Sequence, residues 1–427
     1  MSREAPLPAG FERAMARSET VFAEALELSA DTRGVTRPSF SDKESQLLDL
    51  LDSCGTELGL ESRRDISGNL YLTLPGANRN LPGVLMGSHA DSVPQGGNFD
   101  GLAGILAGIA CLEMLLDGQQ PSCDVSVMAI RGEENAWFGA QHIGSQAALG
   151  LFDQTLLDSA IRSDSGRSLA DHMFEIGLDL EALRHTPPQL TPANVRCFLE
   201  LHIEQGPILV QEELPAAIVT GIRGNVRCPR ARCYGEGGHA GIVPLSLRHD
   251  AVVATAELVA AVQTQWRQRD VAGDDVVLTF GRFHTDADAD SVTTVPRRVD
   301  FSFEVRSHTP RVLEQIRAFI LEEAATLSQI HGVQFNFETW THSPPAEMHA
   351  DLLDKQRRIF RELQLEPFEM ACGAGHDVQD FIAAGIPAAM IFIRNEHGSH
   401  NPDESMAMDD YATAVRVLLE MVQAETQ

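Results

Sequence analysis

The chain has 427 residues, enough for two domains, and its 43% hydrophobic and 22% charged residues are ordinary for a globular enzyme. With 33 basic and 61 acidic residues the formal net charge is −28, so the chain repels nucleic acid and anionic membranes, and neither is expected as a partner. Seven cysteines without a CxxC pair, no apolar leader and no run of about 18 apolar residues favour a cytoplasmic protein without a disulfide framework.

Helical and strand patterns alternate through the first half of the chain. In chain order they predict helices at 19–31 and 43–60, strands in NLYLTLPG and PGVLMGSHADS, a buried helix in GLAGILAGIACLEMLLDG, and strands in CDVSVMAIRGEEN and RCFLELHIEQGPIL. Nearly continuous apolar strands that alternate with helices indicate a mostly parallel sheet covered on both faces. The fold class is therefore predicted to be α/β.

The pattern changes between residues 216 and 337. This stretch predicts two strands, a helix, two strands, a helix and a strand, which together form a compact α+β unit. Afterwards the parallel-sheet pattern resumes, with a helix in LLDKQRRIFREL and a strand in AAMIFIRNEHGSHNP. We therefore predict one α/β domain, residues 1–215 and 338–427, interrupted by a smaller α+β domain at 216–337.

Acidic residues and histidines follow several of the predicted strands, in GSHADSV, GGNFDG, RGEEN, ELHIEQG and GSHNPDE. Taken singly, such motifs have ordinary explanations: a hydrogen-bonded HxD pair in the core, a solvated glutamate pair or a glycine-rich turn. Their chain order, strand-end position and residue types nevertheless agree with a single site. Ligands of open α/β sheets bind beyond the carboxyl ends of the strands, so a metal site is predicted at that edge.

Two divalent cations at such a site would activate a water and polarise an amide carbonyl. The predicted metal ligands are His89, Glu134, His202 and His400 as terminal ligands and Asp100 as the bridging carboxylate. Asp91, two residues beyond His89, is placed to orient that imidazole. Glu133 is expected to be the general base toward the water and then the general acid toward the leaving nitrogen. The residues therefore favour a two-metal hydrolase.

The order of GSHADSVPQGGNFDG, RGEEN, LELHIEQGP, GHAG, GAGHD and GSHNPDE resembles the M20-type metallopeptidase superfamily. Within it, LHIEQGPIL and GAGHD resemble the amidase branch, which holds N-carbamoyl-L-amino-acid hydrolases, β-ureidopropionases and allantoate amidohydrolases. The resemblance covers nearly the whole chain after residue 20. It implies a catalytic domain, an inserted lid or dimerisation domain, a homodimer, and two Zn, Mn, Co or Ni ions held by the ligands named above.

The resemblance also implies residues that contact the substrate. His239 in GHAG would stabilise the oxyanion, although a histidine between glycines can simply fill a turn. Arg306, at the end of VDFSFEVRS, would bind a substrate carboxylate; the ordinary alternative is a surface arginine. Gln205 would bond the ureido or amide group, and Gly375 and His376 would line the pocket. A small molecule with a carboxylate is therefore the expected partner.

Two segments depart from the branch pattern. The run TTVPR at 293–297 stands where the branch usually has Asn-Val-Val/Ile-Pro-Gly, and Thr293 lacks the paired donor and acceptor of an amide. After the glutamate pair the chain reads NAWF at 135–138, where glycine with small or polar residues is commoner. Substrate preference is therefore expected to depend on the segments around Thr293 and Trp137.

The sequence as a whole favours a binuclear metal-dependent amidohydrolase that converts an N-carbamoyl-L-amino acid into the amino acid, carbon dioxide and ammonia. The preference for the L enantiomer is implied by the resemblance alone. Allantoate hydrolysis is the first alternative, and hydrolysis of N-acyl amino acids or dipeptides is the second. A metal-containing dimer that binds ligands without catalysis belongs to a different class. Glu133 argues against that class, because a purely structural metal site has no use for an unliganded base.

Overall fold

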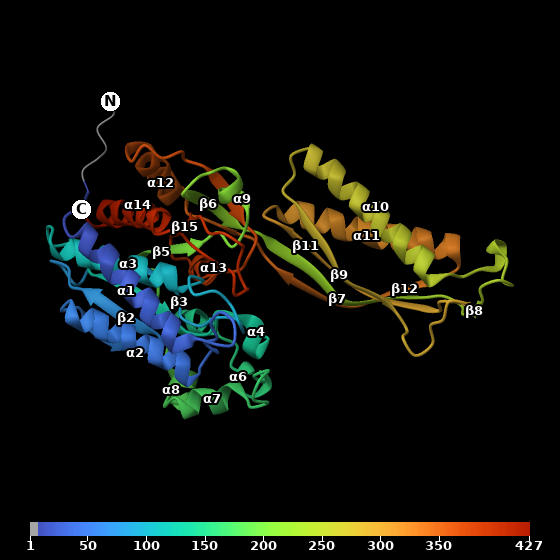
Figure 1. The fold of residues 1–427 in the computed structure, drawn as a ribbon, viewed down its shortest axis with the longest axis horizontal. Coiled ribbons are helices and arrows are strands. Elements are labelled where there is room, and N and C mark those ends of the chain that lie inside the picture. Colours follow the sequence, from blue (N-terminus) through green and yellow to red (C-terminus); the bar gives the residue numbers. More distant parts are fainter. Residues whose placement is uncertain (1–6) are drawn as a thin grey trace. The chain divides into compact units, whose positions relative to one another are not determined.

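The computed structural model describes residues 7–427, which form two compact units (Figure 1). The large unit comprises the chain up to Thr220 together with Met348–Gln427, and the inserted unit comprises Gly221–Glu347. The predicted boundaries, 216 and 337, both lie earlier in the chain than these. They differ because strand β6 (Ala216–Ile222) pairs within the large sheet and because the last long strand of the inserted unit continues to Ser343.

A nine-stranded sheet in the order β1-β2-β4-β3-β5-β15-β6-β13, with β14 paired to β6, forms the centre of the large unit. Besides β6, its strands are β1 (Glu61–Arg64), β2 (Leu70–Leu74), β3 (Gly83–His89), β4 (Val125–Ile130), β5 (Val195–Ile203), β13 (Ala346–Glu347), β14 (Glu369–Cys372) and β15 (Ala388–Ile393). The central strands β4, β3, β5 and β15 are parallel, whereas β1, β2 and β6 pair antiparallel. The predicted α/β class with a largely parallel central sheet is confirmed.

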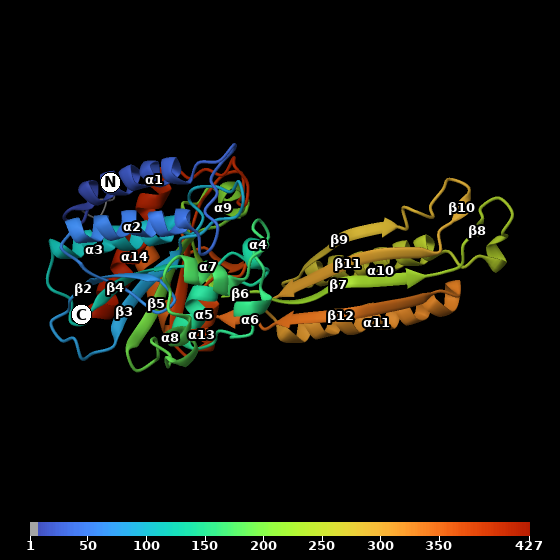
Figure 2. The ribbon, with the colours of Figure 1, turned by 90° about the horizontal axis from the view of Figure 1, so that it is seen from below.

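Helices cover both faces of this sheet (Figure 2). The helices of the large unit are α1 (Phe11–Ser29), α2 (Asp42–Glu57), α3 (Leu102–Leu116), α4 (Asn135–Phe138), α5 (Ile143–Leu149), α6 (Leu156–Ser159), α7 (Leu169–Glu175), α8 (Leu180–His185), α9 (Ile208–Gln211), α12 (Ala350–Glu362), α13 (Val378–Ala383) and α14 (Met408–Thr426). Helix α3 packs on β3, β4 and β5 and is covered by α1 and α14, while α13 packs on β5 and β15 beside α5. The sandwiched position of α3 explains its apolar composition, because every residue from Leu102 to Leu115 is buried.

The inserted unit has the element order β-α-β-β-α-β. Its elements are β7 (Gly224–Tyr234), α10 (Ala251–Val271), β9 (Val277–Thr285), β11 (Arg298–Ser307), α11 (Pro310–His331) and β12 (Gln334–Ser343). The antiparallel order is β12-β7-β11-β9, and α10 and α11 pack together and on these strands. Buried and half-buried residues alternate along β11, as expected of a sheet with one covered face. A two-stranded sheet of β8 (Gly238–His239) and β10 (Thr294–Val295) and a short 3₁₀ helix (Leu245–Leu247) complete the unit.

No helix between residues 7 and 427 combines the length and the apolar character needed to cross a bilayer. All seven cysteines lie in this part of the chain and all are buried thiols. They act as small apolar side chains in the core.

A buried ion pair connects α2 to the loop after β4. Glu44 and Arg131 are both buried, and Arg131 Nη1 donates to Glu44 Oε2 at 2.6 Å. Glu44 also accepts backbone N–H bonds from Phe40 at 2.7 Å and Gly132 at 3.1 Å. Gly132 adopts φ +64°, and a Cβ there would meet the Phe40 ring at 2.5 Å, so this turn requires glycine. The pair therefore holds the segment that carries Glu133 against the helix layer.

Replacing Glu44 with alanine is expected to lower the free energy of unfolding by about 3–5 kcal/mol, because the charge of Arg131 stays buried without its partner. Denaturant unfolding of the two proteins measures the difference. Glu57→Ala on the same helix is the matched control, since Glu57 pairs with Arg17 in an exposed position and should lose less than about 1 kcal/mol. Equal losses in the two variants would contradict the role given to the buried pair.

Candidate metal centre

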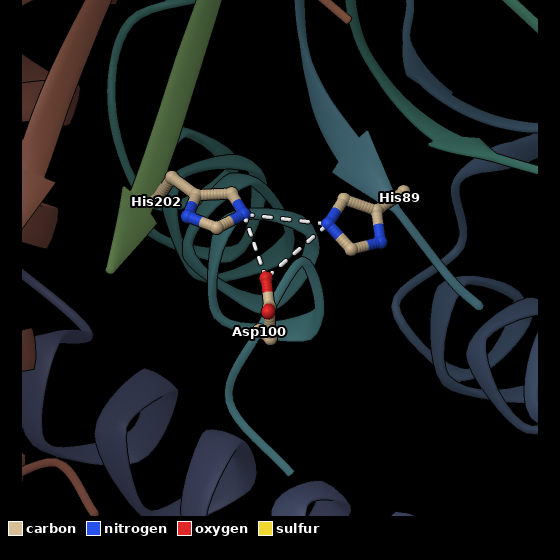
Figure 3. Close-up of side chains that lie close together, drawn as sticks. All are labelled: His89, Asp100 and His202. Atoms are coloured by element: carbon tan, nitrogen blue, oxygen red, sulfur yellow. Dashed lines mark hydrogen bonds and ion pairs between the residues drawn. The ribbon is translucent and has the colours of Figure 1, made fainter. Parts of the chain in front are cut away.

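Two histidines and an aspartate meet at the carboxyl end of the central strands (Figure 3). His89 ends β3, His202 lies one residue before the end of β5, and Asp100 lies two residues before α3 begins. Parallel pairing of β3 with β5 brings the two strand ends together. The Nε2 atoms of His89 and His202 are 3.3 Å apart. Asp100 Oδ1 lies 3.4 Å from His89 Nε2 and 3.0 Å from His202 Nε2.

Backbone carbonyls determine which ring nitrogens face this centre. His89 Nδ1 lies 3.1 Å from the carbonyl oxygen of Asp91, and His202 Nδ1 lies 2.8 Å from that of Ile203. A carbonyl oxygen only accepts, so each Nδ1 carries a proton and Nε2 is the ring nitrogen that can offer a lone pair to the centre. Asp100 Oδ1 is buried and accepts no hydrogen bond from residues 7–427. Three buried electron-pair donors therefore converge, which is a donor set suited to a divalent cation.

A second group of donor atoms shares Asp100 with the first. One ligand atom each from Asp100, Glu134 and His400 lie within 4.8 Å of one another. His400 Nε2 is 3.4 Å from Asp100 Oδ2 and 3.3 Å from Glu134 Oε1. Asp100 therefore turns Oδ1 toward one group and Oδ2 toward the other, so the two groups share one carboxylate. Half of the His400 side chain is exposed, so the second group is open to solvent.

The electrostatics of the cluster favour added positive charge. Burial raises the pKa of Glu134 to about 7, and the hydrogen bond with Glu134 raises the pKa of His400 to about 9. Burial alone would raise the pKa of Asp100, but its close contacts with His202 and His89 outweigh burial and hold that pKa well below its usual value. Burial lowers the pKa of both buried histidines, yet Asp100 outweighs it and the net pKa of each is raised. Protons and a metal cation therefore compete for the same lone pairs.

Asp91 holds the turn that carries the two glutamates. Its carboxylate accepts hydrogen bonds from the backbone N–H of Glu133 at 3.1 Å and of Glu134 at 3.2 Å, and from the Ser39 hydroxyl at 2.5 Å. The same carboxylate is 3.6 Å from His89 Nδ1, farther than the Asp91 carbonyl. The side chain thus positions the glutamate pair, a role that the sequence analysis did not assign to it, while the backbone of Asp91 orients the imidazole.

The two neighbouring glutamates have different partners. Glu134 faces His400, whereas Glu133 Oε1 lies 3.2 Å from Nε2 of the buried His142. One carboxylate oxygen of Glu133, one carboxylate oxygen of Glu134 and a ring nitrogen of His89 all lie within 4.8 Å of one another. Glu133 therefore borders the metal centre with its carboxylate paired to an imidazole.

Polar side chains fix the outer oxygen of Asp100. Gln205 Nε2 donates to Asp100 Oδ2 at 3.0 Å, and the Ser399 hydroxyl lies 2.6 Å from the same oxygen and from Glu404 Oε2. Glu404 in turn accepts the backbone N–H of Asp100 at 3.2 Å, and burial raises its pKa to about 7. Gln205, expected to bond the substrate, thus bonds Asp100 here.

His376 and Gly375 lie beside the centre. The His376 ring centroid is 4.3 Å from that of His202, and neither His376 nitrogen hydrogen-bonds any residue of 7–427. Burial lowers the pKa of His376 well below its usual value, so the ring is neutral. A Cβ at Gly375 would lie 3.3 Å from His142 Nε2, so a side chain there would crowd the partner of Glu133. Two buried unpaired nitrogens on His376 are available to a bound molecule.

The other expected substrate residues, His239, Thr293 and Arg306, lie in the inserted unit. The pairing of β8 with β10 brings His239 and Thr293 close together. The backbone N–H of Gly241 donates to His239 Nδ1 at 3.2 Å, so the neutral ring carries its proton on Nε2 as an exposed donor. Arg306 lies near the end of β11, and its Nη2 is 2.9 Å from Glu304.

Trp137 lies in the core beside the loop that follows His89. Its side chain is only 4% exposed and packs in a hydrophobic cluster with Phe40 and Phe138. Its indole N–H donates to the carbonyl of Ser92 at 2.7 Å. The ring is thus a core residue that braces the loop after His89, and it offers no surface for direct selection of a substrate.

Sequence reasoning missed four residues of this site: His142, Asp380, Ser399 and Glu404. His142 and Asp380 are 238 positions apart and carry no motif, so nothing in the one-dimensional pattern linked them. Ser399 and Glu404 flank the histidine of GSHNPDE, and their contact with Asp100 spans about three hundred positions. The acidic character of the GSHNPDE segment was the available signal.

The family described as Peptidase family M20/M25/M40 matches residues 85–424. An N-carbamoyl-L-amino acid amidohydrolase of Geobacillus stearothermophilus is 34% identical over 392 residues, which are 91% of this chain and 93% of that protein. An allantoate amidohydrolase of Escherichia coli is 32% identical over 367 residues, 85% and 86% of the two chains. The crystal structure of an amidase of the hydantoinase/carbamoylase family from Burkholderia multivorans superposes with a TM-score of 0.87 at 26% identity, over 96% of this chain and 98% of that one.

Proposed function

This chain belongs to peptidase family M20/M25/M40, and we propose that it is a binuclear metal-dependent amidohydrolase whose substrate is an N-carbamoyl-L-amino acid. It is a hydrolase of C–N bonds other than peptide bonds, like its amidohydrolase relatives. The family is metal-dependent. Hydrolysis of the carbamoyl group with one water would yield the amino acid, carbon dioxide and ammonia.

The observation that carries the proposal is the shared carboxylate of Asp100. Its Oδ1 faces the Nε2 atoms of His89 and His202, while its Oδ2 faces His400, which also contacts Glu134. These five side chains would hold two divalent cations, which supply an acidified water and a polarised carbonyl when bound. Histidine and carboxylate donors suit Zn, Mn, Co and Ni.

Glu133 is proposed as the group that moves the proton. Its carboxylate borders the donor cluster and pairs with His142. Glu133 is not one of the five proposed metal ligands, so its carboxylate is available for proton transfer. It would accept the proton of the attacking water and deliver that proton to the departing nitrogen. Asp91 supports this role because it fixes the backbone of Glu133 through the N–H.

His239 is proposed to donate its Nε2–H to the developing oxyanion. The tautomer imposed by Gly241 supports this role.

We also propose a homodimer, because the segment after His239 exposes the apolar side chains of Ile242, Leu245 and Leu247 by 75%, 89% and 67%. Light scattering of the purified protein measures its mass, and a monomeric mass would contradict the dimer. Thr293, which lies close to His239, is proposed to contribute to substrate selection.

Arg306 is proposed to bind the substrate carboxylate. Its guanidinium is held by Glu304, which also pairs with Arg227 on the neighbouring strand β7. A substrate carboxylate would offer Arg306 a bidentate, charge-assisted contact. The relatives named above act on N-carbamoyl-L-amino acids and allantoate, which both carry a carboxylate.

We expect Arg306→Ala to raise KM by about 10- to 100-fold with little change in kcat, the scale of one hydrogen-bonded charge contact. Steady-state kinetics with the best carbamoyl substrate measure both constants. Arg227→Ala is the matched control, because it removes the other partner of Glu304 and should leave KM within about twofold. A KM that is unchanged in Arg306→Ala would remove Arg306 from the substrate site.

A substrate panel tests the proposed activity. The metal-stripped protein, reloaded with Zn, Mn, Co or Ni, is assayed for amine and ammonia release from N-carbamoyl-L-amino acids, N-carbamoyl-β-alanine, allantoate, N-acyl amino acids and dipeptides. Metal-dependent turnover that is fastest on an N-carbamoyl-L-amino acid supports the proposal. Fastest turnover of allantoate would establish the second candidate, which the relative from Escherichia coli favours. Ligand binding without turnover of any amide would indicate a binding protein.

A further inference from the structure

His142 and Asp380 form a buried pair behind the Glu133 carboxylate. His142 Nδ1 lies 2.8 Å from Asp380 Oδ2, and His142 Nε2 lies 3.2 Å from Glu133 Oε1. All three residues are less than 10% exposed. Within residues 7–427, this ion pair is the one side-chain contact of the Glu133 carboxylate, and its geometry is not that of a hydrogen bond. One imidazole therefore lies between two carboxylates that are far apart in the sequence.

The far carboxylate is itself held in place. Asp380 lies on α13 and accepts hydrogen bonds from the Ser145 hydroxyl at 3.3 Å and from Gln146 Nε2 at 3.4 Å. The hydroxyl of Ser145 also contacts Asp377 at 2.5 Å. Because Asp380 only accepts when ionised, His142 Nδ1 carries a proton toward it, and Nε2 attracts the Glu133 carboxylate when it is protonated as well. Burial lowers the pKa of His142, but Asp380 and Glu133 outweigh it and raise that pKa well above its usual value. The ring plane and its direction toward Glu133 follow from this anchoring.

The backbone at His142 is equally constrained. His142 precedes α5 with φ +58°, in the left-handed region that few residues other than glycine and asparagine occupy readily. Its N–H donates to the carbonyl oxygen of Glu133 at 2.9 Å. The backbone of His142 thus contacts the backbone of Glu133, and the side chain of His142 contacts the side chain of Glu133. A strained backbone is retained at His142.

We propose that His142, anchored by Asp380, is a positioning residue that fixes the carboxylate of Glu133 for proton transfer. The inference rests on the proposed function, because it concerns the base of that reaction. A general base acts only when its oxygen is held within hydrogen-bond reach of the proton it takes. A buried carboxylate with a single flexible partner would instead sample several rotamers. The imidazole restricts Glu133 to one of them.

Three variants separate positioning from simple packing. His142→Asn suits the left-handed backbone and keeps a polar group near Asp380, but its side chain is too short to reach Glu133. His142→Gln extends an amide nitrogen toward the position of Nε2. His172→Asn is the matched control, because His172 is buried in the same unit and contacts Ser165 instead of the site.

We expect His142→Asn to lower kcat by about 10- to 100-fold, with KM within about threefold and the bound metal content unchanged. His142→Gln should recover a large part of kcat, and His172→Asn should retain the kcat of the unchanged protein. A merely structural role would lower stability in both asparagine variants without the selective loss of kcat. Equal kcat for His142→Asn and the unchanged protein would overturn the inference.

A crystal structure of metal-free His142→Asn gives a readout that does not depend on activity. The Glu133 carboxylate should leave the conformation in which it faces position 142, whereas it should stay in that conformation in His172→Asn. An unmoved, well-ordered Glu133 in His142→Asn would overturn the inference. If the unchanged protein turned over no amide in the panel, the proposed function would fail while this structure still decided the positioning role.

Discussion

Replacing Glu133 with glutamine is expected to lower kcat by about 10²- to 10⁴-fold, the contribution of a well-placed general base and acid. The amide keeps the size of the side chain but cannot accept the proton of the attacking water. The five proposed ligands remain intact, so the bound metal content should not change. Steady-state kinetics and elemental analysis of the same preparation measure the two quantities together.

Glu113→Gln is the matched control for this prediction. Glu113 is fully buried at the far end of α3 and pairs with Arg13 and Arg17. Its replacement removes a buried negative charge of the same kind without touching the donor cluster. We expect lower stability and an unchanged kcat. A Glu133→Gln protein that kept its metal and more than a tenth of its kcat would show that another group moves the proton.

Asp100→Asn is expected to remove bound metal and to lower turnover by on the order of a thousandfold, the scale of losing one fixed electrostatic partner of the reaction. The substitution takes one negative charge from between the two donor groups. It also replaces one carboxylate oxygen with an amide N–H₂. That group would face His89 and His202 in the position of Oδ1, or His400 in the position of Oδ2. Titration of the metal-stripped protein with Mn or Zn measures the loss of affinity.

The control for Asp100→Asn is Asp410→Asn. Asp410 is another buried aspartate of the large unit, and it binds Arg394 through both oxygens at 2.7 and 2.9 Å. Its loss should lower stability and leave metal affinity as it was. If Asp100→Asn bound metal as tightly as the Asp410 variant does, Asp100 would not be a ligand.

The fold class and the ligand candidates were predictable because both depend on local pattern. Apolar runs such as those of β3 and β15 are buried on both faces, which the continuous hydrophobic pattern already indicated. Polar residues that follow such runs necessarily lie at the carboxyl edge of the sheet, and parallel pairing brings His89 beside His202. The chemistry of these residue types then pointed to divalent cations.

Other features of the site required the tertiary structure. The segment around Trp137 was expected to bear on substrate preference; the sequence did not indicate that the Trp137 ring itself is buried in the core and bonds Ser92. Gln205 turned out to bond Asp100, and Asp91 turned out to hold the glutamate backbone. Local sequence does not determine where a long polar side chain finds its partner.

The sequence by itself determined the α/β class, which follows from the periodicity of apolar residues. It also identified the candidate metal ligands and Glu133 as the candidate base, because these follow from strand-end position and residue chemistry. Only the tertiary structure decided which imidazole nitrogen faces the centre, how Asp100 divides its two oxygens, and that His142 and Asp380 stand behind Glu133. Contacts of this kind join positions hundreds of residues apart, and their geometry is set by backbone carbonyls and packing that no linear spacing encodes.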